Sequence, residues 1–180
     1  MACLATSAPT RAGSNPPDIG DAALRDAGGQ TTRLAALARA NRLTVVVFYA
    51  AGCPCFRAHV ERLQQLAADL GPRGVRFLLI DSERRAPGAP PPPPELAPGL
   101  PLLRDEGGLL ARRLDARYAT ESFVLDPTGR VRYQGGLDSD RKYLRPDAQP
   151  YLRQAISKLL AGDAPAFTSS KALGCALRLM

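Results

Sequence analysis

Two cysteines separated by a single proline, Cys53-Pro54-Cys55, are the residues of this chain best suited to chemistry. They follow the apolar run 45–48, which predicts a buried central strand, and they precede a segment with helical periodicity. Gly52 loosens the backbone before them, and a proline is tolerated in the first turn of a helix, where amides have no partner. A thiol at this position faces unpaired N–H groups and the positive end of the helix dipole, which favour the thiolate. Cys53 is therefore predicted to be a nucleophile.

Thiol–disulfide exchange needs an attacking thiolate, an accessible sulfur and a resolving thiol. Cys55 is the nearest candidate resolver of Cys53 in the sequence. With only one residue between the cysteines, a bridge would close a small, strained ring, and strained disulfides are more easily reduced. If that bridge forms, the protein should be a poor reductant.

A metal site is a second hypothesis for the same turn. His59, the only histidine, lies four residues after Cys55, so both can share one face of a helix. With Cys53 they offer two soft sulfurs and an imidazole, a set suited to Cu(I) or Zn(II). The favoured interpretation is that no metal is bound and that His59 is an ordinary packed or exposed helix residue.

Composition limits the classes of protein to consider. A chain of 180 residues can form one domain with a core. Its formal net charge of +7 comes mostly from scattered arginines, with no basic block alternating with aromatics, so no nucleic-acid partner is predicted. No apolar run reaches the roughly 20 residues that span a bilayer. The four cysteines are too few for a disulfide scaffold.

The first residues predict a flexible leader. Residues 1–20 are rich in Pro, Gly and Ser and contain little to bury, which leaves 21–180 for the domain. Ala2-Cys3 before this polar segment matches the end of a lipoprotein signal whose start was trimmed or misassigned. Cys3 is thus a candidate lipid-anchor site, the alternative being a free cysteine in a disordered leader.

The following elements predict an α/β fold. Residues 21–40 carry apolar side chains at helical spacing, with a short helix over 33–40. The strand, cysteine turn and helix then extend to Leu70, where Gly71-Pro72-Arg73-Gly74 stops the helix. Residues 75–80 form a second apolar strand. A strand, a crossover helix and another strand make a right-handed unit with a parallel pair.

The segment 82–101 is dominated by prolines and is predicted to stay outside the sheet, with a stiff surface insertion over 86–101. A third hypothesis is a non-catalytic binding domain that presents this loop to a partner. Beyond it we predict a short helix at 107–114, a β-hairpin of 122–126 and 130–134, and a helix over 148–160 packed on the sheet.

Three stretches of sequence carry a family resemblance. They are Phe48-Tyr49-Ala50-Ala51-Gly52-Cys53-Pro54-Cys55, the hairpin segment 121–135, and a closing run that ends in Lys171-Ala172-Leu173-Gly174-Cys175. Together with the order of the elements, they resemble the thioredoxin-like superfamily, in the redoxin and thiol-peroxidase-like (AhpC/TSA-type) branch found in bacteria. The resemblance spans roughly residues 30–178. It implies a thioredoxin-like fold with a central mixed β-sheet flanked by helices.

The resemblance also implies roles for individual residues. Cys53 would attack, and either Cys55 or the distal Cys175 would resolve, the latter after a movement of the tail. Thr120 stands where most members have a cis-proline beside the thiol-docking surface, which makes it a candidate substrate-binding residue. Because a non-proline cis bond costs about 2.5–4 kcal/mol, we expect a trans bond there. The chain also departs from the family patterns in its one-residue cysteine spacing and in Ala50, where peroxiredoxins usually carry threonine.

The sequence therefore predicts a thiol-disulfide oxidoreductase or thiol-dependent peroxidase. Its catalytic cysteines would be Cys53, Cys55 and Cys175, and no cofactor is required. Its partners would be a thiol reductant, either a protein or a small thiol, and a peroxide or protein-disulfide substrate. The resemblance and Cys3 together favour a periplasmic or other extracytoplasmic location over a cytoplasmic one.

Overall fold

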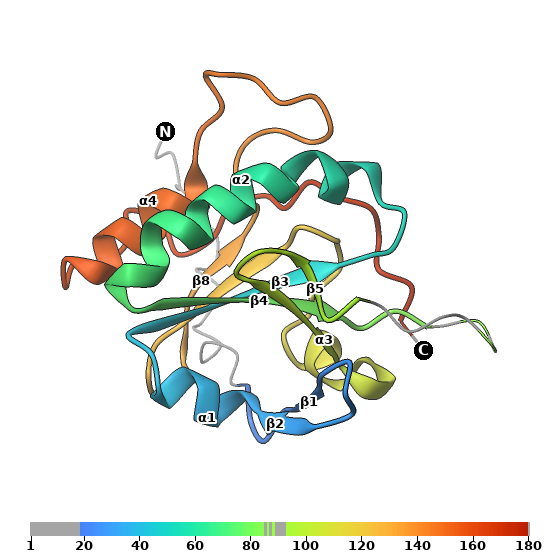
Figure 1. Cartoon of the computed structure of the whole chain (residues 1–180). Helices are drawn as coiled ribbons and strands as arrows, with labels where there is room; N and C mark the ends of the chain where they lie inside the picture. The colour runs from blue at the N-terminus through green and yellow to red at the C-terminus, as the bar shows by residue number, and fades with distance from the viewer. Residues whose placement is uncertain (1–18, 85, 87, 89–92, 180) are drawn as a thin grey trace, which may run out of the picture.

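A computed structural model describes residues 19–84, 86, 88 and 93–179 (Figure 1). The predicted flexible leader, apart from residues 19–20, therefore lies outside the described residues, as do Cys3 and much of the proline run. Ile19, assigned to the leader from the sequence, is only 1% exposed and belongs to the core. The domain thus begins before residue 21, because an apolar side chain in the leader segment finds a place against the sheet.

The centre of the molecule is a mixed β-sheet (Figure 1). In its middle, β3 (Leu43–Tyr49) lies parallel to β4 (Val75–Asp81), which in turn lies parallel to β6 (Leu100–Arg104). On the other side of β3, the hairpin of β7 (Ser122–Leu125) and β8 (Val131–Gly135) completes the sheet in antiparallel fashion. The predicted mixed sheet, parallel strand pair and hairpin are confirmed.

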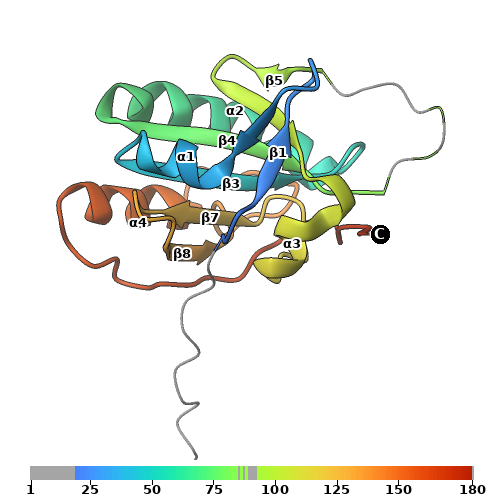
Figure 2. The same ribbon diagram turned by 90° about the horizontal axis from the view of Figure 1, so that it is seen from below.

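Helices cover both faces of this sheet (Figures 1 and 2). On one face lie α2 (Pro54–Leu70) and α4 (Tyr151–Leu160), and on the other lie α1 (Leu34–Arg39) and α3 (Leu109–Arg113). The short 3₁₀ turns η1 (Gly71–Arg73) and η2 (Glu106–Gly108) follow α2 and precede α3. All four predicted helices are present, with ends shifted by a few residues.

The apolar run of β3 explains why both faces must be covered. Successive side chains of a strand point to opposite faces. Val45 and Val47 accordingly pack in the core beneath α2 and α4, whereas Val46 and Phe48 pack in the core beneath α1 and α3. All four are fully buried, so the central strand is fixed from both sides and holds the cysteine turn at its carboxyl end.

The helical spacing predicted for residues 21–40 is wrong in its first half. β1 (Ala23–Arg25) and β2 (Thr31–Arg33) form an antiparallel hairpin instead. The Asp26 side chain accepts a hydrogen bond from the backbone N–H of Gln30 at 2.8 Å, and its carbonyl accepts one from Gly29 at 3.0 Å. This turn chemistry outweighs the weak helical pattern.

The proline-rich segment is more ordered at its end than the sequence predicts. β5 (Glu95–Ala97) pairs with β6, and β6 contains Pro101, so the predicted exclusion of 82–101 from the sheet is wrong. Pro101 is tolerated because it precedes Leu102, where the pairing with β4 begins, so the central ladder loses no donor. None of the helices described is long and apolar enough to cross a membrane.

Candidate active site

Cys53 caps the first turn of α2, as the strand–turn–helix pattern predicts. Its backbone is extended, and its Sγ accepts a hydrogen bond from the backbone N–H of Phe56 at 3.4 Å. Gly52, with a φ of +75°, provides the tight turn from β3. The sulfur therefore lies at the positive end of a 17-residue helix, where a thiolate is stabilised.

The structure places Cys53 in a disulfide with Cys175, 122 residues away in the chain. The two Cα atoms are 5.9 Å apart, within the usual range for disulfides. Cys53 is 5% exposed and Cys175 is half-buried, whereas Cys55 is a buried thiol outside any bridge. Of the two resolving partners left open by the sequence, the distal one is the one bonded here, and the catalytic roles of all three remain predictions.

The C-terminal tail brings Cys175 to this turn. It runs from α4 past β8 toward α3 (Figure 2). Its first half is held by β8. There the backbone N–H of Gln134 donates to the carbonyl of Thr168, and the carbonyl of Gln134 accepts from the backbone N–H of Ser170. Its second half lies along 117–119, where the Ala119 N–H donates to the carbonyl of Cys175 at 2.8 Å. The tail is thus an integral part of the site.

Gly174 makes this approach feasible. A Cβ atom at this position would lie 1.8 Å from the carbonyl oxygen of Ala119, so any side chain there forces the tail away. The absence of a side chain before Cys175 is what allows the two backbones to pair. In the sequence, Gly174 stands out only as part of the closing run of the family resemblance, and no local pattern gives it this role.

We expect Gly174→Ala to weaken the Cys53–Cys175 bond, because the strain arises only when the tail is docked. Overpacking costs about 1–3 kcal/mol, which corresponds to a fall of roughly 5- to 150-fold in the equilibrium constant for disulfide formation. Glutathione redox buffers and mass spectrometry measure that constant. Gly71→Ala is the matched control, since a Cβ there meets nothing within 4 Å. An unchanged constant in Gly174→Ala would contradict the role of the docked tail.

Thr120 lies beside the same tail. Its backbone N–H donates to the carbonyl of Phe48 at 2.8 Å, and its hydroxyl donates to the carbonyl of Leu173 at 3.2 Å. Its φ of +76° is unusual for a β-branched residue and marks a strained position. No cis peptide bond occurs among the described residues, so the expected trans bond is confirmed. Its substrate-binding role remains a prediction, and in this state its hydroxyl holds the tail.

The alternative metal-ligand set of Cys53, Cys55 and His59 differs in one member from the set of side chains that the structure brings together. The sulfurs that meet are those of Cys53, Cys55 and Cys175, all within 4.8 Å of one another. His59 does not join them. Although it shares α2 with Cys55, its Nδ1 faces the Cys55 carbonyl at 2.8 Å and its Nε2 faces Asp138 at 3.1 Å, so both ring nitrogens are engaged. The favoured interpretation of His59 as a packed helix residue agrees with this geometry.

A buried ionic network surrounds His59. Burial alone would lower the pKa of His59, but hydrogen bonds to Asp138 and the Cys55 carbonyl, together with the Asp138 charge, raise it. Burial alone would raise the pKa of Asp138, but hydrogen bonds from His59, the Asp140 amide and Arg62 lower it. Both shifts favour the charged forms of the pair, imidazolium and carboxylate. The pair ties the first turns of α2 to the loop after β8.

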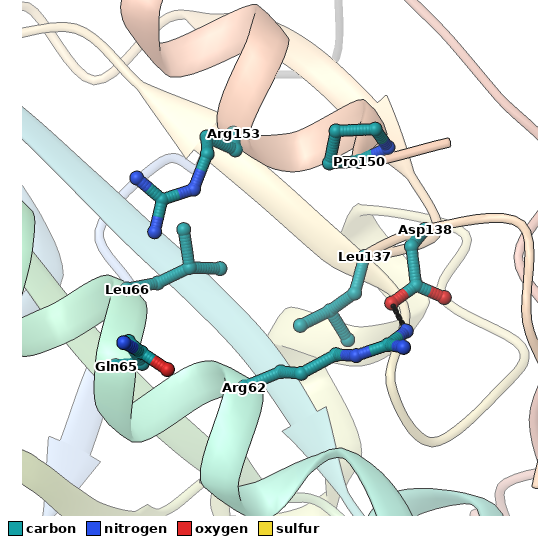
Figure 3. A pocket seen from close by; sticks show the side chains of 7 residues that line it. All are labelled: Arg62, Gln65, Leu66, Leu137, Asp138, Pro150 and Arg153. Carbon is teal, nitrogen blue, oxygen red and sulfur yellow. Dashed lines mark hydrogen bonds and ion pairs between the residues drawn. The ribbon is translucent and has the colours of Figure 1, made fainter. Parts of the chain in front are cut away.

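Arg62 extends this network to the surface. Its guanidinium donates to Asp138 at 2.5 Å (Figure 3). It also donates to Asp140 at 3.1 Å. It also borders a small pocket of about 120 Å³ between α2 and the start of α4, with Arg153 on the opposite side. Arg153 pairs with Asp69 at 2.6 Å. Both pocket arginines are thus neutralised, and no cysteine lines this pocket.

Asp138 and Arg62 are residues of this network that no sequence pattern indicated. The signal that could have linked them is the lone histidine on the apolar side of a helix, because a buried imidazole needs a polar partner. The identity of that partner, 79 residues away, had no local sequence signal.

Comparisons with known proteins agree with this fold. A hypothetical protein from Sinorhizobium meliloti 1021 is 23% identical, with a TM-score of 0.78 over 94% of this chain and 97% of that one. An uncharacterized conserved protein from Geobacillus kaustophilus is 24% identical, with a TM-score of 0.77 over 93% of each chain. Xanthomonas campestris peroxiredoxin Q is 19% identical, with a TM-score of 0.54 over 84% of this chain and 95% of that one. The thioredoxin-like fold is thereby confirmed.

The family assignment comes from the sequence itself. A search of curated proteins found no match. The profile described as the AhpC/TSA family matches residues 17–134, which include Cys53, Cys55 and Thr120 but not the tail with Cys175. The match and the disulfide together support a thiol-dependent redox function. Since the profile covers well over half of its length, this chain belongs to the AhpC/TSA family.

Proposed function

We propose that this protein is a two-cysteine, thiol-dependent peroxidase in which Cys53 attacks the peroxide and Cys175 resolves the product. The observation that carries the proposal is the Cys53–Cys175 disulfide at the N-terminus of α2. One of its sulfurs lies where a thiolate is stabilised, and the other is delivered by a tail docked through backbone hydrogen bonds. Attacking and resolving groups are therefore held together without the neighbouring Cys55.

The reaction balances with these two thiols. The Cys53 thiolate attacks one oxygen of a hydroperoxide, the O–O bond breaks, and with one proton taken up the products are a sulfenic acid and an alcohol or water. The Cys175 thiol then attacks the sulfenic sulfur, forming the S–S bond and releasing water. A reductant supplying two thiols restores the starting state and becomes a disulfide.

Burial favours a small oxidant over a folded protein. Cys53 is only 5% exposed when the tail is docked, so a hydroperoxide reaches it more readily than a disulfide on a protein surface. Cys175 is the more exposed partner and is the sulfur that a reducing thiol would attack. That attack releases Cys53, and a stabilised thiolate is the better leaving group.

Thiol–disulfide exchange with another protein is the second candidate. The partly exposed Cys175 favours it, because a mixed disulfide with a protein needs an accessible sulfur. The physiological reductant, the extracytoplasmic location and the lipid anchor at Cys3 all stay predictions.

The two candidates separate in the oxidation of the reduced protein. We expect cumene hydroperoxide or hydrogen peroxide to form the Cys53–Cys175 bond at least about 100-fold faster than oxidised glutathione or insulin disulfides do. Rapid acid quenching and mass spectrometry give the rates. Faster oxidation by the disulfides would replace the peroxidase proposal with the exchange candidate. Absence of reaction with either class would remove both.

A further inference from the structure

Three sulfurs meet at the start of α2, although the proposed reaction uses only two. Cys53 and Cys55 come from the first turn of the helix and Cys175 from the docked tail, and their Sγ atoms lie within 4.8 Å of one another. Cys55 is 2% exposed and outside the disulfide. A third buried thiol beside a redox pair is unnecessary for peroxide reduction, and three sulfurs in this arrangement can instead bind a soft metal ion.

The spacing suits a metal ion once the disulfide is reduced. A metal–sulfur bond is about 2.3 Å long, so three sulfurs around one ion lie roughly 3.8–4.0 Å apart. The present sulfurs are already within 4.8 Å. Reduction would let Cys53 and Cys175 move apart to this distance while the tail keeps its backbone hydrogen bonds to residues 117–119. The elements that would hold such a site are therefore in place.

We propose that the reduced protein binds one Cu(I) ion through Cys53, Cys55 and Cys175. Thiolate ligands select soft ions, chiefly Cu(I) and Zn(II). Zn(II) in structural sites almost always takes four protein ligands. Within the described part of the chain, no fourth cysteine, histidine or carboxylate joins the three sulfurs. His59 is excluded from the set because Asp138 and the Cys55 carbonyl occupy its ring nitrogens.

The surroundings compensate part of the charge of such a centre. Three thiolates and one Cu(I) ion carry a net charge of −2. The positive end of α2 faces them, and the backbone N–H of Phe56 already points at the Cys53 sulfur. Metal binding and disulfide formation would exclude each other, because both need the sulfurs of Cys53 and Cys175. Bound Cu(I) would therefore block the peroxidase cycle proposed above.

The test is an anaerobic titration of the fully reduced protein with Cu(I) in competition with a chromogenic Cu(I) chelator. We expect one ion per chain and, in X-ray absorption, sulfur neighbours at about 2.3 Å with no nitrogen neighbour. Cys55→Ser should lower the Cu(I) affinity at least about 100-fold, beyond the 10- to 100-fold typical of losing an outer-shell partner. In the same variant the Cys53–Cys175 disulfide should still form on oxidation.

His59→Gln distinguishes the two ligand sets, because His59 contacts only the carbonyl of Cys55 and its loss should lower the Cu(I) affinity by clearly less than the loss of the Cys55 sulfur does. An unchanged affinity in Cys55→Ser, a nitrogen neighbour in the X-ray absorption spectrum, or a stoichiometry other than one would overturn the proposal. The proposed peroxidase activity is measured separately on metal-free protein. Failure of the copper site therefore leaves the peroxidase proposal standing, and failure of the peroxidase leaves the copper site standing.

Discussion

Replacement of Cys53 by serine is expected to lower thiol-dependent peroxide reduction by at least about 10³-fold, because a hydroxyl cannot replace the thiolate as nucleophile. The fold should be retained, since serine is smaller than cysteine and is a favourable residue at the start of a helix. Peroxide consumption with dithiothreitol as reductant measures the effect. Activity above a tenth of the original rate in Cys53→Ser would show that another group performs the attack.

Cys175→Ser is the informative companion variant. The first turnover should proceed, because Cys53 is intact, but the sulfenic acid then lacks its partner. We expect one equivalent of peroxide to be consumed quickly, followed by slow turnover and sulfinic acid on Cys53. Mass spectrometry of the intact protein detects both the sulfenic and the sulfinic acid of Cys53. Undiminished steady-state turnover would instead show that Cys175 is not required to resolve the sulfenic acid.

The largest effect on stability is expected for Asp138→Asn. Asp138 is 6% exposed and faces the buried His59 and the partly buried Arg62. Removing the negative charge leaves the Arg62 guanidinium and the His59 ring without the carboxylate that they share, and breaking a buried pair from one side costs about 3–5 kcal/mol. Urea denaturation measures the change in the free energy of unfolding. Since the loop after β8 would also loosen, we expect the disulfide to form more slowly.

Asp69→Asn is the matched control, because it removes the same charge from a half-exposed pair with Arg153. This substitution should lower the free energy of unfolding by no more than about 1 kcal/mol. The pH dependence gives a second check. The pKa of Asp138 is lowered below its ordinary 3.8. Its contribution to the free energy of unfolding is therefore complete above that value and is lost as the pH falls through the folded-state pKa. The difference between Asp138→Asn and the unmodified protein should therefore shrink below about pH 3.8.

The local parts of the site could be predicted from the sequence. A valine-rich run followed by glycine, a Cys-Pro-Cys turn and an amphipathic segment is enough to place Cys53 at the mouth of a helix, because each signal acts over a few residues. The hairpin about residues 127–129 was predictable for the same reason. The β1–β2 hairpin was missed because its apolar residues follow a helical spacing by chance.

The long-range parts could not be derived from local patterns. The bond between Cys53 and Cys175 closes 122 residues, and the spacing around Cys55 gave no reason to exclude the nearer partner. Only the family resemblance indicated Cys175 as a candidate resolving cysteine. The pairing of His59 with Asp138 also joins distant segments. The fit of Gly174 against Ala119 depends on where the tail docks, which no local rule encodes.

The docked tail also affects the interpretation of Thr120. In the oxidised state its hydroxyl and the strained backbone around it hold the tail rather than a substrate. If a reductant or substrate binds there, it must replace the contact with Leu173. Binding at Thr120 and release of Cys175 would then be a single event, which links the predicted docking residue to the resolving cysteine.

Disulfide mapping after treatment of the reduced protein with one equivalent of hydrogen peroxide tests the central claim most directly. Peptide mass spectrometry under non-reducing conditions should find Cys53 joined to Cys175, with Cys55 still a free thiol. A bridge between Cys53 and Cys55, or sulfinic acid on Cys53 with no bridge at all, would contradict the account.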